Sequence, residues 1–305
     1  MDVAVLGAGS PGRAIAQVCV LAGHAVSLHD DDATAAMDGI DAIEQRLDAA
    51  VAAGEYDDAV RAAAVDRLEA TTGLDAAVAD ADIVIDTART DAGTLQETLA
   101  AVEGMAGRET LMAPTATGIS VTAAAAGLRH PDRAVGLRSG EPLERPLVEV
   151  VVADQTAGDA RDRAVSFVEG LDRSPVVVRD TPGGASVRAE LALEAEAMRL
   201  VEEGVAGVGA VDDALALGYD HPVGPLERAD RAGLDARMEA LEYLQAELGA
   251  RFEPPDVLRD RVASGATGTR TGEGFYRWED GDPTEPALPD PDIPDRAHGP
   301  DDPTG

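Results

Sequence analysis

The sequence predicts an α/β domain built on a parallel sheet, followed by an all-helical domain. Short apolar runs alternate with helical stretches as far as residue 180, and only helical periodicity is found from 181 to 278. From 279 to 305 the chain is rich in proline and aspartate and has few apolar residues. We therefore predict two domains, at 1–180 and 181–278, and a disordered acidic tail at 279–305.

The elements of the first domain alternate between strand and helix. Apolar runs of strand length occupy residues 3–6, 25–29, 83–86, 110–113, 134–137, 147–152 and 176–178. Apolar residues recur at helical spacing in 13–22, 33–53, 94–102 and 157–170. This alternation is typical of a parallel sheet covered by helices, because parallel strands need crossover connections.

The second domain follows a turn. Residues 180–184 read Asp-Thr-Pro-Gly-Gly, a run of turn-forming residues. Beyond it, the spacing of apolar residues predicts helices over 190–203, 211–217, 225–231 and 235–248. The boundary between the two domains is therefore predicted at this turn.

Acidic residues dominate the charge of the chain. In 305 residues, 58 Asp and Glu face 25 basic residues, all of them arginine, which gives a formal net charge of -33. Such a surface repels itself in dilute buffer, whereas at about 1 M salt the Debye length falls to about 3 Å and the repulsion is screened. We expect a halophilic protein of a high-salt cytoplasm. An acidic chain that recruits basic partners is the alternative, although the charge is spread over every helix and not gathered in one block.

The same composition excludes two classes of partner. Scattered arginines cannot form the continuous basic face that a phosphate backbone requires, so we expect no nucleic acid partner. No apolar run approaches the roughly 18 residues of a membrane span, and the chain starts with a strand-like segment, not with a secretory leader. We expect no membrane association and a cytoplasmic location. The single cysteine, Cys19, leaves no disulfide framework and no thiolate metal cluster.

A glycine-rich segment connects the first predicted strand to the first predicted helix, and it reads Gly7-Ala8-Gly9-Ser10-Pro11-Gly12. In this context the first glycine permits a tight turn, the second lets the backbone approach a pyrophosphate, and the third lets helix and strand pack closely. Asp30 ends the second strand, where its carboxylate can accept hydrogen bonds from an adenosine ribose and disfavour a 2′-phosphate. The sequence therefore predicts a Rossmann-like domain that binds NAD.

Two features of this segment leave an alternative open. Glycines at such a turn can serve the turn alone, and Asp30 adjoins two further aspartates in a chain full of aspartate. Pro11 has no N–H, so one backbone donor that could face a phosphate is missing, although proline suits the first helical turn. We expect the affinity for a dinucleotide to be reduced and not lost.

Several segments resemble the 3-hydroxyacyl-CoA dehydrogenase family in order and spacing. They read Gly-Arg-Ala-Ile-Ala-Gln-Val at 12–18, Ala-Asp-Ala-Asp-Ile-Val-Ile-Asp at 79–86, Pro-Asp-Arg-Ala-Val-Gly-Leu at 131–137, Leu-Val-Glu-Val-Val at 147–151, Leu-Gly-Tyr-Asp-His-Pro-Val-Gly-Pro at 217–225 and Thr-Gly-Glu-Gly-Phe-Tyr at 271–276. The resemblance runs from residue 1 to about residue 278. It implies NAD-dependent oxidation of the 3-hydroxyl of an acyl-CoA, a role in fatty acid metabolism, and a homodimer formed through the helical domain.

The resemblance carries only part of the family's catalytic set onto this chain. Glu149 stands at the glutamate that orients the catalytic histidine, and Thr117 stands at the serine that holds the substrate oxygen. Arg138 occupies the histidine position and Val187 the asparagine position. Because an arginine side chain stays protonated up to a pH of about 12, Arg138 cannot act as a general base.

Other positions depart from the family as well. Thr90 stands where the family has a glutamate, and Arg46 is the nearest candidate for contact with the CoA phosphates, a solvated helix-face arginine being the alternative. His221 could replace the missing base, or it could be a loop residue bonded to backbone. For Arg138 beside Glu149 we favour an ion pair over a fork that grips a substrate carboxylate or phosphate.

The sequence thus supports three hypotheses about function. The first is an NAD-dependent 3-hydroxyacyl-CoA dehydrogenase with Thr117, Arg138 and Glu149 at the reacting centre. The second is a catalytically silent relative that binds a nucleotide or an acyl-CoA, which Arg138 and Val187 favour. The third is a dehydrogenase for another hydroxy acid, gripped by Arg138. Turnover of 3-hydroxyacyl-CoAs and of free hydroxy acids separates them.

Overall fold

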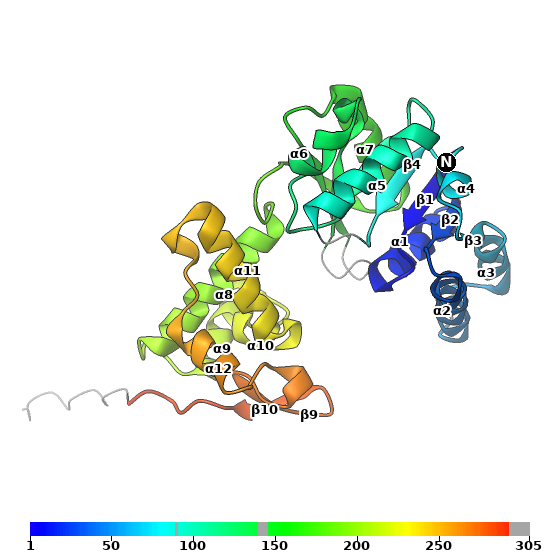
Figure 1. The fold of residues 1–305 in the computed structure, drawn as a ribbon. Coiled ribbons are helices and arrows are strands. Elements are labelled where there is room, and N and C mark those ends of the chain that lie inside the picture. The colour runs from blue at the N-terminus through cyan, green and yellow to red at the C-terminus, as the bar shows by residue number, and fades with distance from the viewer. Residues whose placement is uncertain (89–90, 140–145, 293–305) are drawn as a thin grey trace, which may run out of the picture. The chain divides into compact units, whose positions relative to one another are not determined.

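The computed structural model describes residues 1–88, 91–139 and 146–292. The chain forms two compact units, of which the first ends at Ala185 and the second begins at Ser186 (Figure 1). The predicted boundary, at the turn over 180–184, lies at the end of the first unit. Each unit has a hydrophobic core of its own, built from its own residues.

A five-stranded parallel sheet forms the centre of the first unit. In spatial order its strands are β3 (Leu68–Thr71), β2 (Ala25–His29), β1 (Asp2–Leu6), β4 (Ile83–Asp86) and β5 (Leu111–Pro114). Strand β3 was not predicted, because it is short, lies at the edge and is only partly buried. Since all strands are parallel, their carboxyl ends meet at one edge of the sheet, which is where ligands bind in such folds.

Helices cover both faces of this sheet. The core on one face includes residues of α1 (Ser10–Leu21), α2 (Ala33–Ala52), α3 (Asp58–Val65) and α7 (Gly158–Gly170). The core on the other face includes residues of α4 (Leu74–Val78), α5 (Ala92–Met105) and α6 (Val121–Ala124). Strand β4, whose residues are all buried, contributes to both cores, as expected for a strand with helices on either side.

A second, three-stranded sheet completes the first unit. It consists of β6 (Gly136–Arg138), β7 (Leu147–Val152) and β8 (Ser174–Arg179), with β7 in the middle. Strands β7 and β8 are parallel, whereas β6 and β7 are antiparallel. The chain between β6 and β7 is too short for the crossover that a parallel pair needs. This antiparallel register places Arg138 directly opposite Glu149.

Helices make up most of the second unit. They are α8 (Ser186–Glu202), α9 (Val208–Tyr219), α10 (Pro225–Ala232), α11 (Leu234–Leu248) and α12 (Asp256–Ala263), the last of which was not predicted. Their core includes Leu191, Met198, Leu226, Leu241 and Phe275. The unit therefore folds around one apolar cluster, to which residue Phe275, beyond the last helix, also contributes.

The start of the predicted disordered tail has to be corrected. Strand β9 (Tyr276–Glu279) pairs with β10 (Asp282–Pro286) in an antiparallel hairpin. The buried carboxylate of Asp230 accepts hydrogen bonds from the N–H groups of Phe275 and Tyr276, at 2.8 and 2.9 Å, and from the indole N–H of Trp278, at 2.9 Å. These long-range bonds hold β9, and the proline-containing strand β10 of the predicted tail is ordered by pairing with β9. Residues 293–305 lie outside the described part of the chain.

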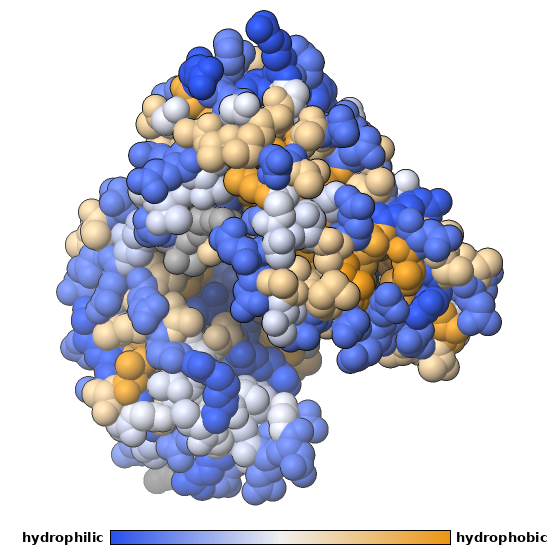
Figure 2. Space-filling model, turned by 45° about the vertical axis from the view of Figure 1, so that its right-hand side comes forward, coloured by the Kyte–Doolittle hydropathy of each residue, from blue (hydrophilic) through white to orange (hydrophobic). Residues whose placement is uncertain are grey.

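The surface reflects the acidic composition. Figure 2 shows hydrophilic residues over most of the visible face, with apolar residues in separate patches. Among the described residues, no helix combines the length and the apolar character needed to cross a membrane.

Candidate active site

The glycine-rich segment forms the connection between β1 and α1, at the carboxyl edge of the parallel sheet. Gly7 has φ +104°, and a Cβ atom there would lie 2.7 Å from Cβ of Ala88. A Cβ atom on Gly12 would lie 1.9 Å from the carbonyl oxygen of Gly7. Around Gly9, by contrast, the nearest heavy atom to such a Cβ atom is Cδ of Pro11, at 4.0 Å. The first and third glycines are therefore required by packing, and the second faces open space.

The start of helix α1 is suited to an anion. Gly9 is the N-cap residue and makes no side-chain cap, and the first turn contains no acidic residue. The N–H groups at the start of a helix lack partners within it and carry partial positive charge. Pro11 removes one of these donors, as the sequence predicts, but its position in the first turn is compatible with the helix.

Asp30 lies against the glycine-rich loop. Its Oδ2 atom accepts the N–H of Ala8 at 3.0 Å, and its Oδ1 atom accepts the N–H of Asp32 at 3.1 Å. The structure therefore brings the two parts of the predicted nucleotide site together, although they are separated along the chain. The carboxylate is half-buried and lies beyond the end of β2.

A second group of polar residues lies around β6 and β7. Arg138 is 6% exposed, and Glu149, opposite it, is 3% exposed. The Nη2 atom of Arg138 donates to the carbonyl oxygen of Ile119 at 2.9 Å and lies 3.8 Å from Oδ1 of Asp180. Asp180 also accepts the N–H of Thr122 at 2.8 Å. Arg138 thus forms an ion pair with Asp180, a residue that the sequence indicates only as part of a turn.

Glu149 is held by the turn that follows β8. Its Oε1 atom accepts the N–H of Ala185 at 3.0 Å. Gly184 has φ +56°, and a Cβ atom there would lie 2.2 Å from Oε2 of Glu149. Only glycine leaves room for the carboxylate at this point. The turn residues of 180–184 therefore contact Glu149 and Arg138 in addition to ending the sheet.

Thr117 is exposed, in the loop that follows β5. It lies two residues before Ile119, whose carbonyl oxygen binds Arg138, so the chain itself brings the three predicted catalytic positions to one region of the first unit. The loop is at the carboxyl end of β5, on the same edge of the sheet as the glycine-rich loop.

The remaining predicted positions are spread over the chain. Arg46 is exposed on α2, and Thr90 lies outside the described residues. Val187, near the start of α8, packs against the apolar core of the second unit, where its side chain can make no hydrogen bond. His221 follows α9 and is half-buried, with its N–H bonded to the carbonyl oxygen of Leu215 at 3.5 Å.

Thr87 is a further residue at the nucleotide edge that the sequence analysis missed. Its hydroxyl donates to the carbonyl oxygen of Leu6 at 2.9 Å and lies 3.3 Å from that of Gly7. It thereby fastens the end of β4 to the glycine-rich loop. Its position directly after a fully buried strand was the signal that could have identified it.

Comparison with known proteins agrees with this geometry. Residues 2–181 match the model of the 3-hydroxyacyl-CoA dehydrogenase NAD binding domain, and residues 186–278 match that of the family's C-terminal domain. The chain is 32% identical over 287 residues to the 3-hydroxybutyryl-CoA dehydrogenase of Bradyrhizobium diazoefficiens, covering 92% of this chain and 96% of that protein.

More distant relatives and solved structures show the same likeness. The mitochondrial hydroxyacyl-coenzyme A dehydrogenase of Sus scrofa is 28% identical over 286 residues, 91% of either chain. The crystal structure of (S)-3-hydroxybutyryl-CoA dehydrogenase from Ralstonia eutropha superposes with a TM-score of 0.86 at 30% identity, covering 91% of this chain and 98% of that one. Because both domains match and the relatives align over nearly the whole chain, the chain belongs to the 3-hydroxyacyl-CoA dehydrogenase family.

Proposed function

We propose that this protein is an NAD-dependent oxidoreductase that oxidises the 3-hydroxyl group of an acyl-CoA. The observation that carries the proposal is the glycine-rich loop, which leaves open space at Gly9 and is hydrogen-bonded to Asp30. NAD, when bound, supplies the acceptor for the hydride of the alcohol carbon. The relatives named above, which share the full length of the two matched domains, support an acyl-CoA substrate.

Several residues of this chain would hold the cofactor. The backbone at Gly9 and the start of α1 would receive the pyrophosphate, because no side chain blocks the approach and the helix terminus favours an anion. Asp30 would accept hydrogen bonds from the adenosine ribose and disfavour a 2′-phosphate. This arrangement supports NAD over NADP.

Oxidation of an alcohol also requires a group that takes the hydroxyl proton. Arg138 cannot serve, because its guanidinium stays protonated. We assign this step to the carboxylate of Glu149, the ionisable group directly opposite Arg138, with the exposed hydroxyl of Thr117 oriented toward the substrate oxygen. Arg138 would then stabilise the negative charge that develops on that oxygen.

The assignment is tested with purified protein in about 2 M KCl, NAD and a series of 3-hydroxyacyl-CoAs, followed by the absorbance of NADH. We expect turnover that falls at least about a hundredfold in Glu149→Gln, the range of general-base catalysis. Arg179→Gln, a change on the exposed face of β8, is the control. Activity that survives Glu149→Gln intact would exclude the carboxylate as the base.

One observation favours a second function, a silent relative that binds nucleotide or acyl-CoA without turnover. Arg138 is buried and bonded to Ile119 and Asp180, so the site is filled by its own side chains. If NAD binds, no CoA ester turns over, and Arg138→His introduces activity, this second function holds.

We also propose a high-salt cytoplasm as the environment and a homodimer as the working form. The net charge of -33 supports the first, and unfolding free energies that rise between 0.2 and 3 M KCl would test it. Leu217 and Tyr219 on α9 are 81% and 74% exposed, which supports self-association through the second unit. Gel filtration in high salt that shows only monomer would contradict the dimer.

A further inference from the structure

An arginine, Arg13, lies near the start of α1, next to the nucleotide edge. It directly follows Gly12, the last glycine of the loop, and it is the only arginine in residues 1–45. Side chains of a helix lean toward its amino terminus, so a residue about one turn into α1 can reach back to the glycine-rich loop. None of the roles described above uses this side chain.

The side chain of Arg13 folds back onto the loop. Its Nε atom donates to the carbonyl oxygen of Ala8, between the first two glycines, at 2.6 Å. The N–H of the same loop residue donates to Oδ2 of Asp30 at 3.0 Å. A single residue of the loop is therefore bonded to the guanidinium through its carbonyl oxygen and to the proposed ribose carboxylate through its N–H.

The protein does not neutralise the charge of this guanidinium. Over residues 1–88, 91–139 and 146–292, Arg13 forms no ion pair, and the bond to Ala8 is the only hydrogen bond of its side chain. A carbonyl oxygen orients a guanidinium without removing its charge. Because Arg13 is half-buried, its two Nη atoms combine a fixed position beside the loop with access for an anion.

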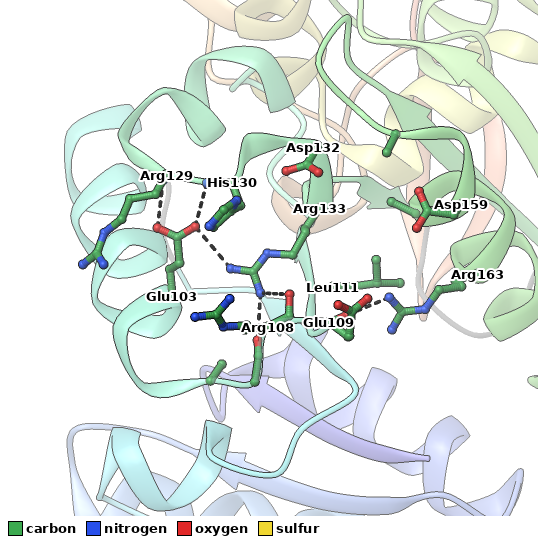
Figure 3. A pocket seen from close by; sticks show the side chains of 14 residues that line it. Glu103, Arg108, Glu109, Leu111, Arg129, His130, Asp132, Arg133, Asp159 and Arg163 are labelled. Carbon is green, nitrogen blue, oxygen red and sulfur yellow. Dashed lines mark hydrogen bonds and ion pairs between the residues drawn. The ribbon is translucent and has the colours of Figure 1, made fainter.

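Arginines at the opposite, amino-terminal edge of the sheet provide a comparison. They line a cavity of about 390 Å³ together with an equal number of carboxylates, and one of these, Glu103, pairs with Arg133 at 3.2 Å (Figure 3). Arg163 at the same cavity is half-buried and has its Nη1 atom bonded to the carbonyl oxygen of Glu109 at 2.7 Å. It resembles Arg13 in contact and burial but lies away from the glycine-rich loop.

The start of α1 has lost one donor that could face a phosphate, because Pro11 has no N–H. The remaining backbone N–H groups carry only partial positive charges. A guanidinium has a full positive charge and forked N–H donors that match the oxygens of a phosphate. Arg13 can therefore replace the donor that Pro11 removes.

We propose that Arg13 binds the phosphate of NAD that is attached to the adenosine ribose, an inference that rests on the proposed function. Asp30 is the proposed ligand of that ribose, and both side chains are bonded to Ala8, so a group next to the ribose lies within reach of the guanidinium. The Nε atom keeps its bond to the loop, and the Nη atoms donate to phosphate oxygens. Arg13 holds the cofactor and takes no part in hydride transfer.

Arg13→Gln separates the charge from the contact with the loop. The amide nitrogen of glutamine is as many bonds from the backbone as Nε of arginine, so the variant can keep the bond to Ala8 while it loses the charge and the Nη donors. In calorimetric titrations in about 2 M KCl, we expect the dissociation constant for NADH to rise at least about tenfold. The dissociation constant for adenosine, which has no phosphate, should stay unchanged when it is measured by displacement of NADH. Arg163→Gln is the matched control and should change neither value.

Two results with the Arg13→Gln variant overturn the proposal. The first is an unchanged NADH affinity, even if the affinity for NADPH falls, because the guanidinium would then contact only a 2′-phosphate. The second is an equal loss of affinity for NADH and for adenosine, because the substitution would then have changed the shape of the loop. Failure of the parent chain to bind NADH is a separate result, which contradicts the proposed function and this inference together.

Discussion

The nucleotide edge and the residues around Arg138 lie in the same unit but place different physical requirements on the sequence. At the nucleotide edge the requirement is steric, since Gly12 has a backbone oxygen 1.9 Å from the place of its Cβ atom. Around Arg138 the requirement is polar partners from other segments, namely the carboxylate of Asp180 for its charge and the carbonyl oxygen of Ile119 for an N–H. The residue at the catalytic position can therefore be replaced while the nucleotide loop is retained, provided that the new side chain is hydrogen-bonded or ion-paired.

The largest effect on stability should come from replacing the third glycine of the loop, which packing requires. Gly12→Ala forces a methyl group onto the carbonyl of Gly7, so we expect the unfolding free energy of the chain to fall by about 2 to 3 kcal/mol and NAD binding to be lost. Denaturant unfolding and calorimetry measure the two effects.

Gly9→Ala is the matched control for this change. Open space surrounds Gly9 and its φ of -71° suits alanine, so stability should stay within about 0.5 kcal/mol. NAD affinity should still fall about tenfold or more, because the methyl group lies where the pyrophosphate approaches. Equal loss of stability in both variants would contradict the distinction between packing and binding glycines.

The charge balance around Arg138 is tested by Asp180→Asn. The variant removes a charge that lies 3.8 Å from a buried guanidinium, and we expect a loss of up to about 3 kcal/mol in unfolding free energy. Arg138→Met in the same background should recover most of it. If Arg138→Met lowers stability as much in the Asp180→Asn background as in the parent chain, the two residues are not coupled.

A buried ion pair in the helical unit, Glu194 with Arg237, should make the stability of the chain depend on pH. Burial raises the pKa of Glu194 to about 7, against the opposing effect of Arg237, whose Nε lies 3.0 Å from Oε2. At pH values between about 4.5, the ordinary pKa of a glutamate, and about 7, Glu194 therefore binds a proton in the folded state but not in the unfolded state. Stability should fall as pH rises through this range, by about 2 kcal/mol. Glu194→Gln should flatten this slope, which urea unfolding at pH 5 and pH 8 would measure.

The smallest effect is expected at the ribose end of the nucleotide edge. Asp30→Asn keeps the size of the side chain but removes its charge, so NAD affinity should fall about fivefold and discrimination against NADP should weaken. Parallel titrations with NADH and NADPH measure both. Unchanged discrimination would mean that Asp30 serves the loop alone.

Features that depend on local chemistry could be predicted from the sequence. The glycine spacing, Asp30 and the alternation of strands and helices were sufficient for the architecture and the nucleotide edge, because turns and periodicity are properties of neighbouring residues. The matched NAD binding domain confirms the cofactor.

The features that sequence reasoning missed depend on contacts between distant segments. Asp180 has the sequence context of a turn residue, although it pairs with Arg138 across the fold. The second strand of the hairpin has the composition of a tail, but it pairs with β9, which Asp230, far back in the chain, holds in place. Both cases involve a carboxylate whose partners are set by tertiary structure, which no local pattern records.

The most direct test of this account is whether the glycine-rich loop receives a dinucleotide. In a calorimetric titration of the folded chain with NADH in about 2 M KCl, we predict saturable heat with one equivalent per chain, weakened by Gly9→Ala and by Asp30→Asn. A chain that unfolds cooperatively under these conditions yet gives no heat with NADH would contradict it.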